Sequence, residues 1–249
     1  MTKLIKIYGE RNTNTNYLSK LIALNLVAKE VPGTVPSTIM EIQKLLPGNE
    51  FVRDVYFYFT YKKNLGWKHT LVLPQKELNK YQLVDSNLFF LTITKNPYSW
   101  LLSLYRNPYH QYFDNRQSFE FFLKSQWKSV KRDNTKKVLR NPIELWNIKN
   151  KSYLQLDKKN TINITTEEMF QDAGKVISRI SNKFLIKRKS KTFINYERST
   201  KDMTKNSSYY QDYYLSEKWK NDLSKDAIAI INESIDRDLM AHFRYSILT

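Results

Sequence analysis

The sequence predicts an α/β fold, a central parallel sheet flanked by helices, in a single domain that spans residues 1–249. Three observations support this prediction. Residues 88–94 form a nearly continuous apolar run, as a strand buried on both faces of a parallel sheet requires. Short apolar runs alternate along the chain with segments of helical periodicity. The chain has 249 residues, of which 41% are hydrophobic, so it can bury the core of one such domain.

Four segments are expected to be strands or extended chain. Residues 4–8 form a short apolar run that only Lys6 interrupts, which is typical of a first strand. Residues 51–60 are rich in aromatic and β-branched side chains, which favour a strand or an extended segment. Residues 88–94 are the clearest strand, and residues 161–164 are expected to form a short one.

Helices are expected where apolar residues recur every three or four positions, as the leucines and isoleucines of residues 15–28 do. Asn96-Pro97 indicates a helix start, because Asn is a good cap and Pro is tolerated in the first turn. Residues 185–222 are basic, tyrosine-rich and poorly periodic. The predicted helices are residues 15–28, 37–46, 98–106, 118–129, 143–156, 166–184 and 227–243.

The composition excludes several classes of protein. The chain has no cysteine, which excludes disulfides, zinc–thiolate sites and cysteine nucleophiles. No apolar run approaches the length of a membrane span. The first residues are too polar for a signal peptide, so we expect a cytoplasmic protein.

The net charge is strongly positive. Lys and Arg number 41 against 24 Asp and Glu, which gives +17. Such an excess favours polyanionic partners: nucleic acid, an anionic membrane surface or a phosphorylated cofactor. Two short basic runs stand out, at residues 131–137 and 187–191. Because the chain is rich in Lys, Asn and Ile throughout, many of its lysines are equally compatible with an ordinary solvated surface.

The turn from Gly9 to Thr15 is the first candidate binding site. It follows a predicted strand and opens a predicted helix, which directs backbone N–H groups and the positive end of the helix dipole at one spot. Arg11, Thr13 and Thr15 can add side-chain donors. This turn is suited to a phosphate group, although Thr and Asn are also ordinary caps at a helix start.

Lys95 is the second candidate, because it follows the clearest strand. In open α/β sheets, ligands bind beyond the carboxyl ends of the strands, where Lys95 can meet an anion. The helix that follows carries Ser103. The simpler alternative is a surface lysine followed by a serine packed within the helix.

Neither segment fits a magnesium-dependent nucleotide kinase. The first loop lacks the Walker A pattern with its terminal lysine, and no Asp ends the strand at residues 88–94 to hold magnesium. The loop is suited to one phosphate without a metal, and we expect no metal site.

Together these segments resemble the two cofactor loops of the sulfotransferase family. Residues 9–18 resemble its 5′-phosphosulfate loop. Asn96, Pro97 and Ser103 match its 3′-phosphate motif, with Lys95 where the family usually has arginine. The likeness extends loosely over most of the chain. It implies a P-loop nucleotide-binding-like fold and 3′-phosphoadenosine 5′-phosphosulfate as the donor cofactor.

The chain departs from the family pattern in several places. Lys95 keeps the charge of the usual arginine but loses its bidentate geometry. Asn12 stands where lysine is usual, and Arg11 is expected to supply the missing charge. Asn14 stands where glycine is usual, and Asn accepts left-handed backbone angles better than most residues, so a tight turn is allowed. The family's glycine-rich segment near the C-terminus is absent, and residues 187–191 are the candidate replacement.

The resemblance also implies residue roles. In the sequence Gly-Trp-Lys-His, His69 resembles the family's catalytic base, and Lys68 or Arg11 would stabilise charge on the leaving oxygen. A lone histidine is nevertheless more often a packed core residue. Tyr17 or Trp67 would stack on adenine, or serve as core. The predicted cofactor-binding residues are Arg11, Asn12, Thr13, Asn14, Thr15, Asn16, Lys95 and Ser103.

The predicted function is transfer of a sulfuryl group to a hydroxyl or amine acceptor, a small molecule or a saccharide, with release of adenosine 3′,5′-bisphosphate. One alternative is a nucleotide or small-molecule kinase on a degenerate P-loop, which would need a magnesium ligand. The other is a basic nucleic-acid-binding protein. Its support is the charge of +17 and the 14% aromatic residues, but no recognised binding motif is present, so we expect no nucleic-acid partner.

Overall fold

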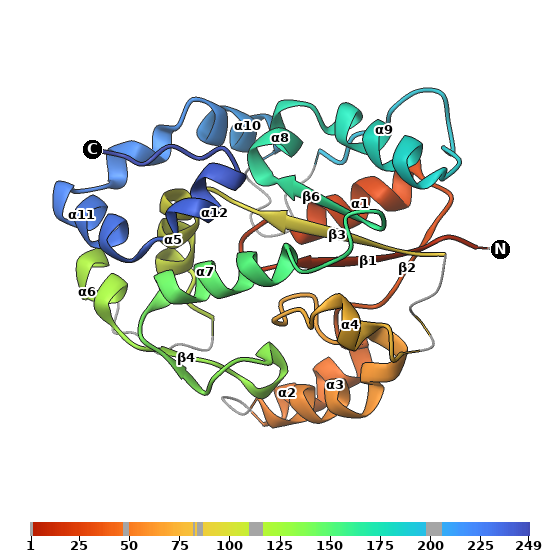
Figure 1. The fold of residues 1–249 in the computed structure, drawn as a ribbon, viewed down its shortest axis with the longest axis horizontal. Helices are drawn as coiled ribbons and strands as arrows, with labels where there is room; N and C mark the ends of the chain where they lie inside the picture. The colour runs from red at the N-terminus through yellow and green to blue at the C-terminus, as the bar shows by residue number, and fades with distance from the viewer. Residues whose placement is uncertain (1, 47–49, 82, 84–86, 110–116, 198–205) are drawn as a thin grey trace.

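The computed structural model describes residues 2–46, 50–81, 83, 87–109, 117–197 and 206–249. In this part of the chain, four strands form a parallel sheet in the order β2-β1-β3-β6, with helices on both faces (Figure 1). The predicted α/β fold with a central parallel sheet flanked by helices is therefore confirmed. The strands are β1 Leu4–Gly9, β2 Lys29–Glu30, β3 Leu88–Thr94 and β6 Thr161–Thr165.

The strand order opens a crevice at one end of the sheet. β1 lies between β2 and β3, so the chain leaves β1 toward one side and later returns on its other side. Where connections diverge in this way, a ligand crevice forms beyond the carboxyl ends of the strands. Leu4 pairs with Leu88 and Gly9 pairs with Ile93, so the residues after β1 and β3 emerge side by side at this end.

Hydrophobic clusters cover both faces of the sheet. On one face, Ile5 and Ile7 of β1 pack with α1 (Thr15–Asn25) and α9 (Ala173–Phe184). On the other face, Tyr8 belongs to a second cluster that also contains residues of β3. Every residue of β3 is buried, which explains why its sequence is apolar rather than alternating.

A third cluster lies beyond the carboxyl end of β3. It contains the buried Trp100 of α5 (Pro97–Arg106), together with the buried Trp127 and Trp146. The predicted cap is present, because the Asn96 side chain accepts a hydrogen bond of 3.1 Å from the first turn of α5. The other helices are α2 Ser37–Lys44, α3 Phe51–Asn64, α4 Gln75–Leu78, α6 Phe119–Lys124, α7 Pro142–Tyr153, α8 Thr166–Gln171, α10 Ser207–Leu215, α11 Lys225–Ser234 and α12 Arg237–His242.

The strand expected at residues 51–60 is wrong, because this segment lies within helix α3. Asp54 in the first turn and two lysines in the last turn favour a helix through its dipole. Among the apolar side chains of α3, only Phe57 is fully buried. The other aromatic residues therefore lack the packing against a sheet on which strand propensity depends. Helical hydrogen bonding therefore outweighs the strand propensity.

Three predicted helices differ most from the observed elements. The helix expected at residues 118–129 ends at Lys124, and β4 (Trp127–Lys128) then pairs with β5 (Val138–Leu139). The other two are broken at an aspartate that caps the next helix. Asp172 accepts from the α9 backbone at 2.8 Å, and Asp236 caps α12 in the same way.

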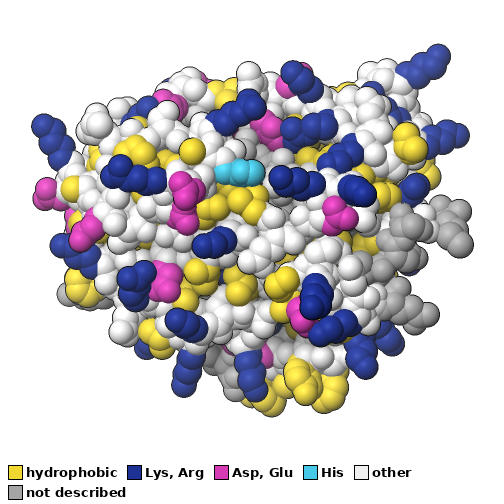
Figure 2. All heavy atoms as spheres, in the orientation of Figure 1, with side chains coloured by type: hydrophobic (Ala, Val, Ile, Leu, Met, Phe, Trp, Pro, Cys, Tyr) yellow, Lys and Arg dark blue, Asp and Glu magenta, His cyan; other side chains and the backbone are white. Residues whose placement is uncertain are grey.

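No helix among the described residues is long and apolar enough to span a membrane. The face of the molecule in Figure 2 shows lysine and arginine side chains spread across the surface rather than gathered into one stripe. On this face the basic charge therefore has the distribution of an ordinary solvated surface.

Candidate active site

A cavity of ≈ 560 Å³ lies at the carboxyl ends of β1 and β3. Its walls come from the loop between β1 and α1, the segment after α3, and helices α5, α8 and α10. The structure thus brings together residues that are far apart in sequence. The predicted site residues that line it are Asn12, Asn14, Thr15, Asn16, Lys68, His69 and Ser103, while Arg11, Thr13 and Lys95 lie behind the surface.

The loop after β1 is a tight turn shaped by glycine and asparagine. A Cβ on Gly9 would lie 2.3 Å from Ile93 Cγ2 and 2.9 Å from the Ile93 carbonyl oxygen, so no larger residue fits there. Asn12 and Asn14 adopt left-handed backbone angles, with φ of 65° and 64°. The tight turn allowed at Asn14 is therefore present, and α1 begins at the next residue.

This loop offers hydrogen-bond donors to the cavity. The Nδ2 atom of Asn14 is buried and has no hydrogen-bond partner in the described part of the chain. A buried donor in this state costs about 1–3 kcal/mol, which an anion in the cavity would offset. Thr15 and Asn16, in the first turn of α1, line the same wall. Thr13 closes the loop instead, because its hydroxyl donates to the Glu10 carbonyl oxygen at 2.6 Å.

Arg11 lies outside the cavity wall, contrary to the charge-supplying role expected from the sequence. It is buried, with Nη1 2.7 Å from Glu10 and Nη2 3.2 Å from Asp133. Burial alone would disfavour its charge, but Asp133 and Glu10 outweigh burial and raise the pKa of Arg11. Arg11 therefore braces the loop from behind. This role was not predictable from local sequence, because Asp133 lies 122 positions away along the chain.

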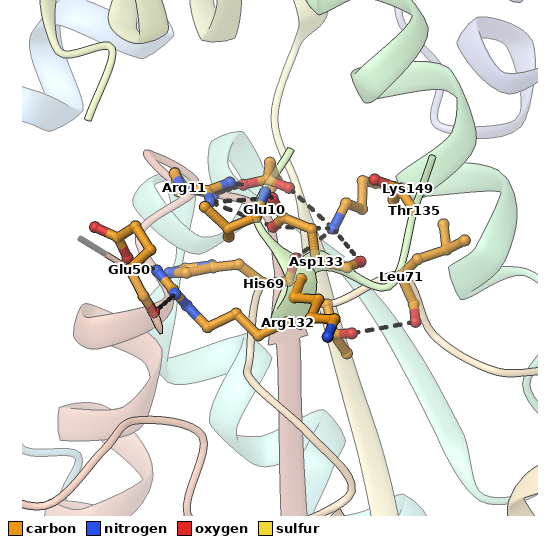
Figure 3. A network of polar contacts seen from close by, with 12 residues as sticks. Glu10, Arg11, Glu50, His69, Leu71, Arg132, Asp133, Thr135 and Lys149 are labelled. Atoms are coloured by element: carbon orange, nitrogen blue, oxygen red, sulfur yellow. Dashed lines mark hydrogen bonds and ion pairs between the residues drawn. The ribbon is translucent and has the colours of Figure 1, made fainter. Parts of the chain in front are cut away.

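Lys149 completes a buried ionic network around Arg11 (Figure 3). Its Nζ lies 3.5 Å from Glu10 Oε2 and 3.7 Å from Asp133 Oδ1. Nζ also donates to the backbone carbonyl oxygens of His69 and Asp133. Figure 3 shows Glu10 between the Arg11 and Lys149 side chains. One network thus ties the loop after β1 to the segment that carries His69.

Two guanidinium groups form cation–π contacts with the ring of Trp67. Its ring centre lies 4.6 Å from the Arg11 guanidinium carbon and 4.3 Å from that of Arg132. Arg132 in turn forms ion pairs with Glu50 and Asp54 of the α3 region. Trp67 does not line the cavity, so the structure places this candidate for adenine stacking in the packing behind it.

His69 faces the cavity, and its Nδ1 is hydrogen-bonded to the Gly9 carbonyl oxygen. A carbonyl oxygen only accepts, so Nδ1 carries the proton and Nε2 keeps the lone pair of the neutral ring. Burial lowers the pKa of His69 well below its usual 6.5, and the charges of Lys68 and Arg11 add to this effect. The ring is therefore neutral at physiological pH, and Nε2 can accept a proton.

Lys68 also lines the cavity, beside the base. Its Nζ donates to the Asn16 side-chain oxygen in the first turn of α1. Gly33 leaves room for it, because a Cβ there would lie 2.8 Å from Lys68 Cβ. The ammonium group is thus held next to the start of α1, where developing negative charge would be stabilised.

Lys95 is fully buried at the carboxyl end of β3. Its Nζ donates at 2.7 Å to the Ser103 hydroxyl and at 2.7 Å to the Tyr214 hydroxyl. Ser103 lines the cavity, so the predicted pair is brought together, with the serine in front of the lysine. Asn12 joins this part of the site to the first loop, since its Nδ2 donates to the Ser103 carbonyl oxygen at 3.1 Å.

The remaining wall is aromatic, and sequence reasoning found only part of it. Tyr17, one of the two candidates for adenine stacking, lines the cavity, and its ring stacks on Phe170 of α8 with centres 5.6 Å apart. Phe170 stacks in turn on Tyr210 and Tyr214 of α10. The tyrosine-rich composition of residues 185–222 was the only available signal for α10.

The basic run at residues 187–191 does not reach this wall. Its backbone pairs with the end of α1, where Val27 N donates to Lys187 O at 2.8 Å and Lys189 N donates to Asn25 O at 2.8 Å. The loop after β1 is at the opposite end of α1, because the helix starts at Thr15. The replacement for the family's glycine-rich segment that the sequence suggested therefore lies at the wrong end of this helix.

No protein-family model matches this chain, and no curated protein matches it by sequence. Solved structures do match over its whole length. A sulfotransferase domain from the curacin biosynthetic pathway aligns with a TM-score of 0.51 at 12% identity, covering 100% of this chain and 99% of that one. The chain has the sulfotransferase fold.

A second solved structure extends this finding. The sulfotransferase domain of the Synechococcus PCC 7002 olefin synthase aligns with a TM-score of 0.50 at 12% identity, covering 100% of this chain and 96% of that one. Mouse sulfotransferase SULT7A1, complexed with PAP, aligns with a TM-score of 0.49 at 13% identity, covering 98% of this chain and 89% of that one. In the sulfotransferase fold of this protein, the cavity lies at the diverging strands β1 and β3.

Proposed function

We propose that this protein is a sulfotransferase that moves a sulfuryl group from 3′-phosphoadenosine 5′-phosphosulfate to a hydroxyl or amine acceptor, a small molecule or a saccharide. The observation that supports the proposal most directly is the position of His69 in the cavity. Its Nδ1–H is fixed on the Gly9 carbonyl oxygen, and its neutral Nε2 belongs to the same cavity as the anion loop. A base and an anion-binding turn in one cavity are what acceptor activation and sulfuryl transfer require.

The residues present fit the two phosphates of this donor. The loop from Asn12 to Thr15 would hold the 5′-phosphosulfate, since it offers the unpartnered Nδ2 of Asn14 and the start of α1. Ser103, backed by the buried Lys95, would hold the 3′-phosphate. The aromatic wall that includes Tyr17 would accept the adenine ring.

His69 would act as general base. In the transfer, the acceptor oxygen or nitrogen forms a bond to sulfur while the bond from sulfur to the bridging oxygen of the phosphosulfate breaks. The acceptor proton moves to His69 Nε2, and the electron pair of the broken bond leaves with adenosine 3′,5′-bisphosphate. Lys68 would stabilise the negative charge that grows on the bridging oxygen, because its ammonium lies beside the start of α1.

The test is calorimetric titration with adenosine 3′,5′-bisphosphate and with AMP. The bisphosphate should bind more tightly by about 1.5–3 kcal/mol, the contribution of hydrogen bonds to a charged group. Lys95→Ala should erase that difference while AMP still binds. Equal affinity of the wild-type protein for the two nucleotides would rule out the proposed donor.

A further inference from the structure

Helix α10 brings to the Lys95–Ser103 pair a residue that the sequence motif does not contain. Tyr214 lies in this helix, lines the cavity, and accepts a hydrogen bond of 2.7 Å from Lys95 Nζ. Ser103 accepts the second hydrogen bond of Lys95, also at 2.7 Å, and lines the cavity as well. Two hydroxyl groups that belong to cavity-lining residues are therefore hydrogen-bonded to the buried ammonium group of Lys95.

An ammonium group behind a hydroxyl makes that hydroxyl a better donor. Each oxygen that accepts from Lys95 is polarised, so its own O–H proton becomes more acidic and binds an anion more strongly. The Ser103 hydroxyl already donates to the Ser99 carbonyl oxygen at 2.9 Å, so a phosphate in front of this pair would receive its hydroxyl donor from Tyr214, together with the field of one buried cation. Direct contact with the lysine is not needed.

The position of Tyr214 is fixed by packing rather than by this hydrogen bond alone. Its ring stacks on Phe170 of α8 with centres 5.5 Å apart, and the side chain is 8% exposed. Phe170 is itself stacked on Tyr17 of α1. A ring held in this way presents its hydroxyl at a defined point, as a specificity contact requires.

A second cation lies beside this point. Arg106 follows Ser103 by three positions in α5, so the two side chains share one face of the helix, and both line the cavity. Its guanidinium forms contacts of 3.0 Å with Tyr213 and 2.8 Å with Asp222, and the side chain is half exposed. α5 and α10 thus bring positive charge and hydroxyl groups to the same part of the wall.

We propose that Tyr214 is a specificity-determining residue that donates to the terminal 3′-phosphate of the nucleotide and transmits to it the charge of Lys95. This inference rests on the proposed function, whose phosphate subsite it completes. Helix α10 then takes the place of the glycine-rich segment that the chain lacks. The residue discriminates nucleotides with a 3′-phosphate from those without one.

The experiment measures the affinities of adenosine 3′,5′-bisphosphate and AMP for the wild type, Tyr214→Phe and Tyr210→Phe by calorimetry. Phenylalanine at position 214 keeps the ring on Phe170 and removes only the hydroxyl. Tyr214→Phe should weaken binding of the bisphosphate about tenfold and change AMP binding less than about twofold. Tyr210→Phe is the matched control on the same helix, stacked on the same Phe170, and should keep the wild-type ratio of the two affinities.

Two results would overturn the inference while leaving the proposed function intact. A ratio in Tyr214→Phe within about twofold of wild type would show that the hydroxyl does not contact the 3′-phosphate. Tighter binding of the bisphosphate by Tyr214→Phe than by wild type would show that the Tyr214 hydroxyl shields Lys95 from the ligand. If the wild-type protein itself does not distinguish the two nucleotides, the proposed function fails, and this inference fails with it. AMP binding by each variant verifies that its cavity is folded.

Discussion

His69 is hydrogen-bonded through Nδ1 to the carbonyl oxygen of Gly9, the last residue of β1. The candidate base is therefore fastened to the strand that leads into the anion loop. A second link comes from Lys149, which donates to the His69 backbone carbonyl and lies 3.5 Å from Glu10. The distance between base and loop is thus set by backbone groups and a buried ionic network, which favours a fixed geometry for transfer.

The first prediction concerns the base. His69→Ala should lower turnover by about 10²–10⁴-fold, the usual contribution of a positioned general base. Affinity for adenosine 3′,5′-bisphosphate should remain close to wild type, because the proposed phosphate contacts lie on other residues. The measurement is steady-state turnover with an acceptor, or slow donor hydrolysis as a surrogate.

His242→Ala is the matched control, because this exposed histidine ends α12 outside the cavity wall. His110, the remaining histidine, lies outside the described residues, and His110→Ala is likewise expected to have little effect. Turnover of His69→Ala within about threefold of wild type would place the base elsewhere, far short of the usual general-base contribution.

The second prediction is the pH dependence. Burial, with the charges of Lys68 and Arg11, lowers the pKa of His69 well below 6.5 in the folded protein. Between that depressed pKa and 6.5 the unfolded chain binds one more proton, so stability rises with pH, by at most about 1.4 kcal/mol per pH unit. This stability is lost progressively as the pH falls from 6.5 to the pKa of His69 in the folded protein. Urea unfolding from pH 5 to 7.5 should show this slope, and His69→Gln should flatten it.

The same depressed pKa predicts the rate profile. The acid limb of kcat/KM, which reports the free enzyme, should lie below pH 6.5, because the ring of the ligand-free protein stays neutral down to its depressed pKa. An acid limb centred above pH 7 would identify a different base.

The tight turn after β1 and the fold were predictable from the sequence because their signals are local. Strand β3 is a nearly continuous apolar run, and Asn96-Pro97 is a helix start that the structure keeps. Asn14 needs a left-handed backbone, which its residue type already allows. Propensity, cap and turn chemistry agree at these positions, so the sequence alone was sufficient.

The parts that could not be predicted depend on contacts between distant residues. The carboxylates that bind Arg11 include Asp133, 122 positions away along the chain. Tyr214 reaches Lys95 across 119 positions, from a segment without clear periodicity. Residues 51–60 have strand propensity, but the sheet has no place for them, and tertiary context decides in favour of α3.

The third prediction concerns metals. Among the described residues, no group of three or more His, Asp or Glu side chains is arranged to hold a metal ion. Under the proposed function, sulfuryl transfer should proceed at an undiminished rate in excess EDTA, whereas a kinase needs magnesium to bridge phosphates. The measurement is turnover with EDTA against turnover with added magnesium. An absolute magnesium requirement would favour the kinase alternative.

The fourth prediction tests the turn at Asn14. Asn14→Ala should destabilise the protein by about 1–2 kcal/mol, because a Cβ without a compensating side chain is disfavoured at φ 64°. Asn14→Gly should be neutral in stability, since glycine adopts this angle freely. It should still bind adenosine 3′,5′-bisphosphate more weakly, because it removes the buried Nδ2 donor. Equal binding by Asn14→Gly and wild type would show that the amide does not contact the ligand.

The last prediction concerns the ionic network behind the site. Lys149→Met should destabilise the protein by about 3–5 kcal/mol, because it leaves Glu10 and Asp133 buried with Arg11 as their shared cation. Glu10→Gln in the same chain should recover part of this loss by removing one carboxylate charge. We expect a coupling energy of about 1–3 kcal/mol in a double-mutant cycle measured by urea unfolding.

An exposed ion pair provides the control for this cycle. Lys44 and Glu41 lie 2.8 Å apart in α2, with side chains 68% and 66% exposed. Lys44→Met combined with Glu41→Gln should give a coupling energy below about 0.5 kcal/mol, because solvent screens the pair. If the two cycles give the same coupling energy, Lys149 is not an integral part of the buried network. A drop in turnover of Lys149→Met, measured where the variant is fully folded, would then be assigned to its contacts with the backbone carbonyl oxygens of His69 and Asp133.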